Sequence, residues 1–194
     1  MSQTPRSLLE QLRREPSAAS WKRLVDLYTP WLQGWFRQYH LAAADVEDLV
    51  QDVLAVIVRE MPSFEHNQQS GAFRRWLRMI ALNRLKGFWR DRRSGPLVAT
   101  SEEAAKLLDQ LPDPASDPDR QWEQEHDQFI VRRALELIEP EFTASTWAAF
   151  RRQVIDRASP AEVAAELGLT ANAVVLAKFR VMRHLRRELD GLTG

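Results

Sequence analysis

The chain has 194 residues, of which 44% are hydrophobic and 28% charged, values that are usual for a soluble globular protein with one ordinary domain or two small ones. It contains no cysteine, which excludes disulfide bonds and cysteine-based metal sites. The N-terminal sequence lacks an apolar signal core, and no run approaches the roughly 18 apolar residues that span a bilayer. We therefore expect a cytoplasmic protein without membrane insertion.

The formal net charge of zero conceals an uneven distribution of charge along the chain. Residues 1–93 hold 15 basic and 10 acidic side chains, residues 94–128 hold 2 and 9, and residues 129–194 hold 10 and 8. Screening limits the reach of each charge to about 8–10 Å, so a local stripe matters more than the total. Basic segments on either side of an acidic connector are compatible with nucleic-acid binding, and also with a self-masked form of the free protein.

Apolar residues recur at three- and four-residue steps through most of the chain, and no segment shows the alternation of a β-strand. The helices predicted by this spacing cover residues 24–36, 46–57, 73–91, 122–138, 143–156, 160–167 and 171–190. The second of them is expected to end before Pro62. A stretch rich in Pro, Asp and Ser at 94–120 predicts a linker with one short helix near 102–111.

Residues 159–189 have the pattern of a helix-turn-helix followed by a basic tail. Ser159 is a suitable N-cap, and Pro160 suits the first helical position. Gly168 falls where a left-handed residue can end the helix, and Thr170 can cap the next one. A plain helical hairpin is the alternative, but the order of caps, glycine turn and basic tail favours binding of duplex DNA.

In a helix-turn-helix, the start of the second helix faces the base edges of the major groove. This start is unusually apolar here, so it can contact thymine methyl groups but offers no bidentate arginine–guanine pair in its first turns. The residues that we expect at the duplex are Thr170, Asn172, Ala173, Val175, Leu176, Lys178, Phe179, Arg180 and Arg183.

The predicted helix at 73–91 combines aromatic and basic residues. Between positions 74 and 93 there are eight basic side chains and one acidic one, Asp91. An exposed charged face is the common explanation, but ordinary surfaces mix both signs. Single-stranded DNA is bound by cations that neutralise phosphates and by aromatic rings on which bases stack, at about 1–3 kcal/mol for each base. The residues expected to face a core are Phe73, Trp76, Leu77 and Ile80, and the basic residues expected in solvent are Arg74, Arg75, Arg78, Arg84, Lys86 and Arg90.

No pattern of residues predicts an enzyme, a metal site or a cofactor. The four histidines, His40, His66, His126 and His184, are scattered and have no second ligand at a helical spacing. The seven glycines form neither a dinucleotide-binding fingerprint nor a P-loop. We therefore expect no catalytic residue, no metal ligand and no cofactor.

Three motifs together resemble those of a bacterial RNA polymerase sigma factor of the extracytoplasmic-function group, within the sigma-70-like family. They are DVEDLVQDVLAVIVREMPSF at 45–64, GAFRRWLRMIALNRLKGFW at 71–89 and SPAEVAAELGLTANAV at 159–174. No single motif is decisive, but all three stand in the family's order, and the resemblance extends from about Trp21 to Leu189. It implies an all-α protein with two small helical domains joined by an acidic Pro-rich linker, the second domain containing the helix-turn-helix. The implied boundaries are 1–95 for the first domain, 96–121 for the linker and 122–194 for the second domain.

The resemblance also implies partners: core RNA polymerase, through its β′ clamp helices and β flap, and promoter DNA in duplex and single-stranded form. An anti-sigma factor is a further possible partner. The residues implied in docking on the clamp are Asp45, Glu47, Asp48, Gln51 and Asp52. Asp45 has an alternative role as a helix N-cap. The residues implied in melting and reading the −10 element are Phe64, Phe73, Arg74, Arg75, Trp76, Arg78, Asn83, Arg84, Lys86 and Arg90, with a flipped base near 63–73.

The sequence departs from the family pattern at several positions. Val175, Leu176 and Ala177 stand where the family usually has polar or basic residues for reading the −35 element, and Met79 stands where a basic residue is common. Gly87 interrupts a helix at a cost of about 1 kcal/mol relative to alanine. Two other functions remain open: a stand-alone helix-turn-helix regulator that does not bind polymerase, and an adaptor whose apolar face near Phe179 binds protein.

Overall fold

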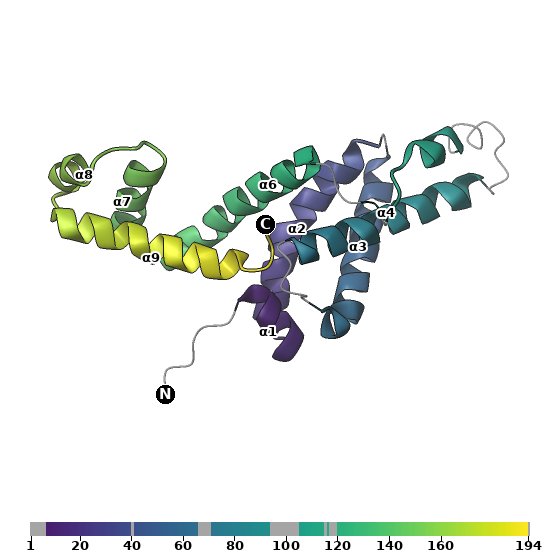
Figure 1. Cartoon of the computed structure of the whole chain (residues 1–194), viewed down its shortest axis with the longest axis horizontal. Coiled ribbons are helices and arrows are strands. Elements are labelled where there is room, and N and C mark those ends of the chain that lie inside the picture. Colours follow the sequence, from purple (N-terminus) through teal and green to yellow (C-terminus); the bar gives the residue numbers. More distant parts are fainter. Residues whose placement is uncertain are drawn as a thin grey trace. The chain divides into compact units, whose positions relative to one another are not determined.

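The computed structural model describes residues 7–39, 41–65, 71–93, 105–114, 116 and 120–193. In this part of the chain all regular secondary structure is helical, as predicted (Figure 1). The α-helices are α1 (Leu8–Arg14), α2 (Ala18–Arg37), α3 (Ala43–Glu60), α4 (Ala72–Arg93), α6 (Arg120–Ile138), α7 (Ala144–Val154), α8 (Pro160–Leu167) and α9 (Ala171–Leu189). Two short 3-10 helices, η1 (Met61–Ser63) and η2 (Glu139–Glu141), follow α3 and α6, and residues 105–110 are also helical.

The chain divides into two compact units: an N-terminal unit formed by Leu9–Ile130 together with Gly191–Gly194, and a C-terminal unit formed by Val131–Asp190 together with Met1–Leu8. These units do not divide where the predicted domains do, because the first half of α6 belongs to the N-terminal unit. The reason is aromatic packing. The Trp31 ring on α2 lies 5.9 Å from the Trp122 ring, 5.5 Å from His126 and 5.7 Å from Phe129, measured between centroids.

In the N-terminal unit, α3 packs against both α2 and α4. Helix α2 begins at a capping box in which Ser17 and Ser20 each accept a hydrogen bond from the other's backbone N–H. Helix α3 ends before Pro62, as predicted, and passes into η1. Helix α4 continues through Gly87 without a break. The core side chains between these helices include Leu24, Leu27, Leu32, Val53, Ile57, Leu77, Leu82 and Leu85.

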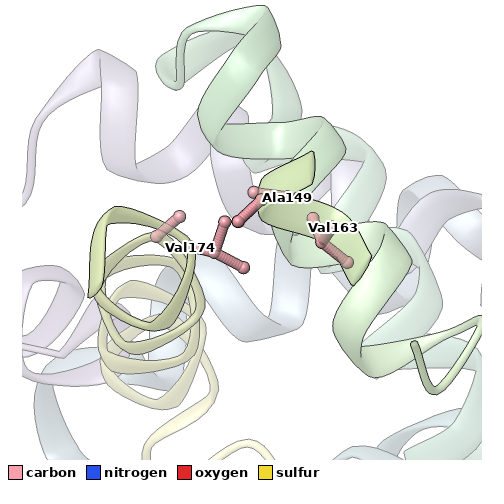
Figure 2. Close-up of a cluster of buried hydrophobic side chains, with 5 residues drawn as sticks. Ala149, Val163 and Val174 are labelled. Carbon is pink, nitrogen blue, oxygen red and sulfur yellow. The ribbon is translucent and has the colours of Figure 1, made fainter. Parts of the chain in front are cut away.

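In the C-terminal unit, α7, α8 and α9 pack on one another around a small apolar core. Ala149, Val163 and Val174, one from each helix, lie together between the helices, and Ala164 and Ala177 complete the buried cluster (Figure 2). Small side chains at these positions allow the three helices to approach closely, so a short three-helix unit retains a dry centre.

The turn between α8 and α9 has the caps that the sequence predicts. Ser159 forms a capping box with Glu162 and is followed by Pro160, and Gly168 ends α8 in the left-handed conformation at φ 65°. Thr170 then caps α9 by accepting a hydrogen bond from Ala173 N–H. The axes of the two helices are bent by 105°. This angle lies within the roughly 90–120° of helix-turn-helix units.

No single helix in the described ranges is both long and apolar enough to cross a membrane.

Candidate nucleic-acid interface

The aromatic residues at the start of α4 form a cluster with Phe64, which follows η1. The Phe64 ring stacks on Trp76 at 4.7 Å and meets Phe73 edge-on at 5.8 Å. Phe73 is fully buried and also contacts Tyr28, so it supports the cluster from the core, as its predicted core position implies. Phe73 was also predicted to contact single-stranded DNA, and that prediction does not agree with its burial. Trp76 is half-buried and keeps an accessible surface.

Arg74 is not in solvent, contrary to the prediction, since only 6% of its surface is exposed. Its Nη1 donates to Asp127 Oδ2 at 2.6 Å, and its Nη2 donates to Glu123 Oε1 at 2.8 Å. Burial acts to lower the pKa of Arg74, but the hydrogen bonds and charges of Asp127 and Glu123 outweigh it and raise that pKa. Arg74 is therefore a buried cation held by two carboxylates of α6.

Arg78 is also buried, with 6% of its surface exposed, so the prediction of a solvated side chain is wrong here too. Its Nη1 donates to the backbone oxygen of Ser116 at 2.9 Å, and its guanidinium carbon lies 6.0 Å from the centre of the Trp122 ring. Both arginines are covered by residues that lie 38 to 53 positions further along the chain than the arginines themselves. A helical period cannot show such a contact.

The other polar residues assigned to this face remain accessible. Arg75, Asn83 and Arg90 are exposed, and Arg84 and Lys86 are half-buried. Arg75 lies near the start of α4 and the other four lie in its second half. The candidate surface for a nucleic-acid strand in this structure is therefore shorter and less basic at its start than the sequence predicts. Residues 66–70 of the predicted base pocket lie outside the described residues.

The acidic face predicted on α3 is present. Glu47, Asp48, Gln51 and Asp52 are exposed on one side of the helix. Their side chains extend into solvent because the apolar residues of α3 occupy the opposite side, which packs on α2 and α4. An exposed run of carboxylates on a rigid helix can meet a basic partner with little rearrangement.

Asp45 is not the N-cap of α3, so that alternative is wrong. The helix begins after Ala42, which makes no side-chain capping bond. Asp45 lies in the first turn and accepts a hydrogen bond from Arg92 Nη2 at 2.7 Å. The Arg92 guanidinium also lies 4.5 Å from the centre of the Phe88 ring. The sequence pattern did not single out Arg92, because its partner lies 47 residues away.

A cavity of about 230 Å³ lies between α3 and α4. Its lining includes residues of both predicted sets, the one for docking on the clamp and the one for reading the −10 element. Its lining residues are Asp45, Asp48, Leu49, Asp52, Asn83, Arg84, Gly87, Phe88 and Asp91. Gly87 leaves space on the α4 side, since a Cβ there would meet nothing within 4 Å. The acidic side chains of α3 and the polar side chains of α4 thus share one concave surface.

The predicted duplex-reading surface of α9 is open. Its side chains Thr170, Asn172, Leu176, Lys178, Phe179, Arg180 and Arg183 are exposed, and Ala173 and Val175 are half-buried. Phe179 keeps 63% of its surface exposed and Leu176 keeps 43%, high values for large apolar side chains. The opposite side of the helix holds Val174, Ala177, Val181 and Leu185 in the core. All nine residues expected at the duplex lie outside this core, and seven of them are exposed.

A buried polar group on α6 was not foreseen. His126 has no exposed surface, and its ring stacks on Trp122 at 5.5 Å and lies 5.8 Å from Tyr28. Burial, more than any other cause, lowers the pKa of His126. The spacing of Trp122, His126 and Phe129, by four and then three residues, was the available indication that these rings share one face.

The part of the chain that the structure describes contains no group of three or more His, Cys, Asp or Glu side chains that could hold a metal ion.

Comparison with known proteins agrees with this arrangement in the N-terminal unit. The family model for Sigma-70 region 2 matches residues 24–95, a range that runs from α2 through α3 and α4. No curated protein matches the chain. Residues 24–95 are therefore similar to Sigma-70 region 2, the domain with which sigma-70 family sigma factors bind core RNA polymerase and promoter DNA.

Proposed function

We propose that the chain is a sigma factor of the extracytoplasmic-function group that binds core RNA polymerase and directs promoter recognition, DNA melting and transcription initiation. The observation that carries this proposal is the region 2 match over 24–95, on helices that expose an acidic face on α3 and a basic-aromatic face on α4. A sigma factor is not an enzyme, because the polymerase performs the chemistry. The helices of this protein need only to bind the polymerase and the promoter and to position one relative to the other.

In this proposal the acidic face of α3 docks on the β′ clamp helices. Glu47, Asp48, Gln51 and Asp52 are exposed and supply the charge that an Arg-rich coiled coil would pair with. Asp45 contributes from the rim of the α3–α4 cavity, where it is already paired with Arg92. Charge complementarity of this kind steers association and fixes the register of the two surfaces.

Helix α4 reads the −10 element as a melted strand. Arg75, Arg84, Lys86 and Arg90 neutralise phosphates, Asn83 offers hydrogen bonds, and Trp76 provides a ring on which a base can stack. Phe64 stacks on the Trp76 ring and Phe73 packs against it at a tilt, so both hold it in place. Arg74 and Arg78 belong to the same basic run of α4 but lie on its buried side.

The C-terminal unit reads the −35 element through α8 and α9 and meets the β flap. Two observations support this: the 105° bend at a capped glycine turn, and the exposure of Arg180, Arg183 and Lys178 on α9. The apolar pair Leu176 and Phe179 would contact thymine methyl groups, since guanine readers are missing from the first turns. The same apolar pair is the surface on which an anti-sigma factor would dock. The protein acts in the cytoplasm.

The test is transcription of fragmented genomic DNA by core polymerase with and without this protein, with sequencing of the RNA 5′ ends. New start sites that share two upstream elements are expected. The variant Asp48→Ala with Asp52→Ala should lose these starts, and the control Glu10→Ala with Glu15→Ala, which removes the same charge outside α3, should keep them. Absence of new starts, with the polymerase active on another sigma factor and duplex DNA still bound, would support a stand-alone helix-turn-helix regulator.

A further inference from the structure

Two adjacent side chains at the end of α7 connect this helix to α8 and α9. Gln153 donates from Nε2 to the backbone oxygen of Val174 in α9 at 2.7 Å, and also to that of Ala149 in α7 at 3.0 Å. Arg152 donates from Nε and Nη2 to Glu166 Oε2 of α8 at 3.0 and 2.8 Å. All of these residues lie in the C-terminal unit, so both contacts belong to a single compact body.

The bond from Gln153 to α9 lies beside the apolar core of this unit. Val174 and Ala149 are fully buried and lie together between the helices (Figure 2), and Gln153 itself is half-buried. Carbonyl oxygens only accept hydrogen bonds, so both partners require the amide nitrogen, which has two hydrogens to donate. A polar group left there without partners would cost free energy. Gln153 is therefore a specific bridge between α7 and α9.

The neighbouring contact with α8 is of a different kind. Arg152 and Glu166 are partly exposed, with 39% and 48% of their side chains accessible, and Arg152 also pairs with Asp156 at 3.0 Å. Ion pairs in such surroundings contribute little to stability, because water and salt screen them. The buried side chains of Val163 and Ala164 pack α8 into the core. Arg152 is thus a matched neighbour of Gln153 whose bonds do not reach α9.

Val174 lies within the part of α9 that is expected to face the bases. The expected base-facing residues on either side of it are Asn172, Ala173, Val175 and Leu176. Apolar contacts with thymine methyl groups depend on close placement, because a gap of about 1 Å already forfeits up to half of the dispersion attraction between two atoms. The first turns of α9 therefore need a fixed position relative to the rest of the unit, and the Val174 carbonyl is a point at which they are attached.

We propose that Gln153 is a positioning residue for the reading of duplex DNA, which holds the base-facing turns of α9 in place through the Val174 carbonyl and touches no base itself. This inference rests on the proposed function, because it takes the −35 element as the ligand of α9. Without the bridge, α9 can shift against α7. Its preference for particular bases then falls, whereas the long, exposed side chains of Arg180 and Arg183 still reach the phosphates.

The experiment is a selection of DNA by core polymerase bound to the full chain. The complex is mixed with a pool of duplexes of random sequence, and the bound duplexes are sequenced. The wild-type complex should select two elements, an upstream one read by α9 and a downstream one read by α4. Gln153→Met removes both donated hydrogen bonds but keeps the length and the neutral charge of the side chain. We expect it to weaken the upstream base preference about fivefold, near the lower end of what one base pair contributes, and to leave the downstream preference unchanged.

The control is Arg152→Met, the same substitution one residue earlier. It removes the ion pairs with Glu166 and Asp156 and should keep both preferences. Gln153→Lys keeps a donor on a side chain of similar reach and should retain most of the upstream preference. An upstream preference that Gln153→Met leaves intact, or that Gln153→Met and Gln153→Lys reduce equally, overturns the role of the hydrogen bond.

Protection of the upstream duplex from hydroxyl radicals separates positioning from loss of the fold. In the complex with Gln153→Met this protection should persist, because the phosphate contacts remain. If the protection disappears together with the base preference, the substitution has removed the whole contact, and a role limited to positioning is wrong.

The same selection separates failure of this inference from failure of the proposed function. If the wild-type complex selects two elements and the Gln153→Met complex selects both equally well, only the positioning role is wrong. If the wild-type complex selects no element, while the same polymerase does so with another sigma factor, the proposed function itself is wrong.

Discussion

His126 and Asp127, neighbours on α6, share a hydrogen bond of 2.9 Å between the imidazole Nδ1 and the carboxylate Oδ1. Because an ionised carboxylate only accepts, we assign the donor to Nδ1. The other nitrogen, Nε2, is buried and has no hydrogen-bond partner. A second proton on the ring would place an unpaired donor in the core. Burial is the largest cause that lowers the pKa of His126, and Arg74 acts in the same direction, while Asp127 and Glu123 oppose them.

We expect the free energy of unfolding to fall as the pH drops below 6.5, the ordinary pKa of histidine. The pKa of His126 is lowered in the folded protein, so in this range the unfolded chain binds the proton more readily. The stabilisation that comes from keeping His126 neutral is complete above pH 6.5. It is lost as the pH falls toward the lower pKa that His126 has in the folded protein. Urea unfolding between about pH 7.5 and about pH 5 measures the slope. His126→Phe keeps a ring in the stack and should flatten it, whereas equal slopes would assign the effect to other groups.

Arg74→Ala should lower the free energy of unfolding by about 2–4 kcal/mol, because it removes a buried cation and leaves two carboxylates to be rehydrated. Those carboxylates are partly exposed, which keeps the loss below that of a fully buried pair. Lys86→Ala, on the same helix, should change stability by less than about 1 kcal/mol. Denaturant unfolding of the two variants compares them directly. Similar small losses for both would show that Arg74 does not need its α6 partners.

Two glycines should respond in opposite ways to alanine. Gly87 lies within α4, and a Cβ there would meet nothing within 4 Å, so Gly87→Ala should stabilise the protein by about 0.5–1 kcal/mol. Gly168 has a φ of +65°, which L-residues adopt at a cost, so Gly168→Ala should destabilise by about 1–2 kcal/mol. The thermal midpoints of the two variants test both signs. A lower midpoint for Gly87→Ala would contradict the open space beside α4.

Arg180→Ala with Arg183→Ala should weaken binding of duplex DNA and reduce its dependence on salt. Removing two phosphate contacts lowers the slope of log affinity against log salt concentration by about 1.8. The matched control is Arg132→Ala with Arg151→Ala, which removes two exposed cations from α6 and α7. Titrations of duplex DNA at several salt concentrations give both quantities. If test and control variants keep the wild-type affinity and slope, α9 does not form the interface with the duplex.

Local patterns in the sequence predicted most of the helices because the information for them lies within a few residues. Ser159, Gly168 and Thr170 act only on adjacent backbone groups, and the structure confirms all three caps. The buried and exposed sides of α9 also follow from spacing alone. The start of α3 was less predictable, because Asp45 suits an N-cap by type but lies inside the helix and pairs with Arg92 instead.

The contact between Arg74 of α4 and the carboxylates of α6 could not be predicted in the same way. The spacing of Trp122, His126 and Phe129 indicates an apolar face, but not the element on which that face packs. Arg74 resembles its exposed neighbours in every local respect, and its burial depends on carboxylates 49 and 53 residues further along the chain. Contacts at such separations depend on tertiary packing, which helical periodicity does not encode.

The separation of 53 positions between Arg74 and Asp127 also corresponds to an interval of time. A ribosome adds about 5–20 residues each second, so Arg74 is added roughly 3–10 seconds before its partner Asp127. During that interval the aromatic core of the N-terminal unit lacks the rings of α6. Completion of the N-terminal unit must therefore wait at least until translation has passed Ile130, well after the last residue of the segment that matches Sigma-70 region 2 has been added.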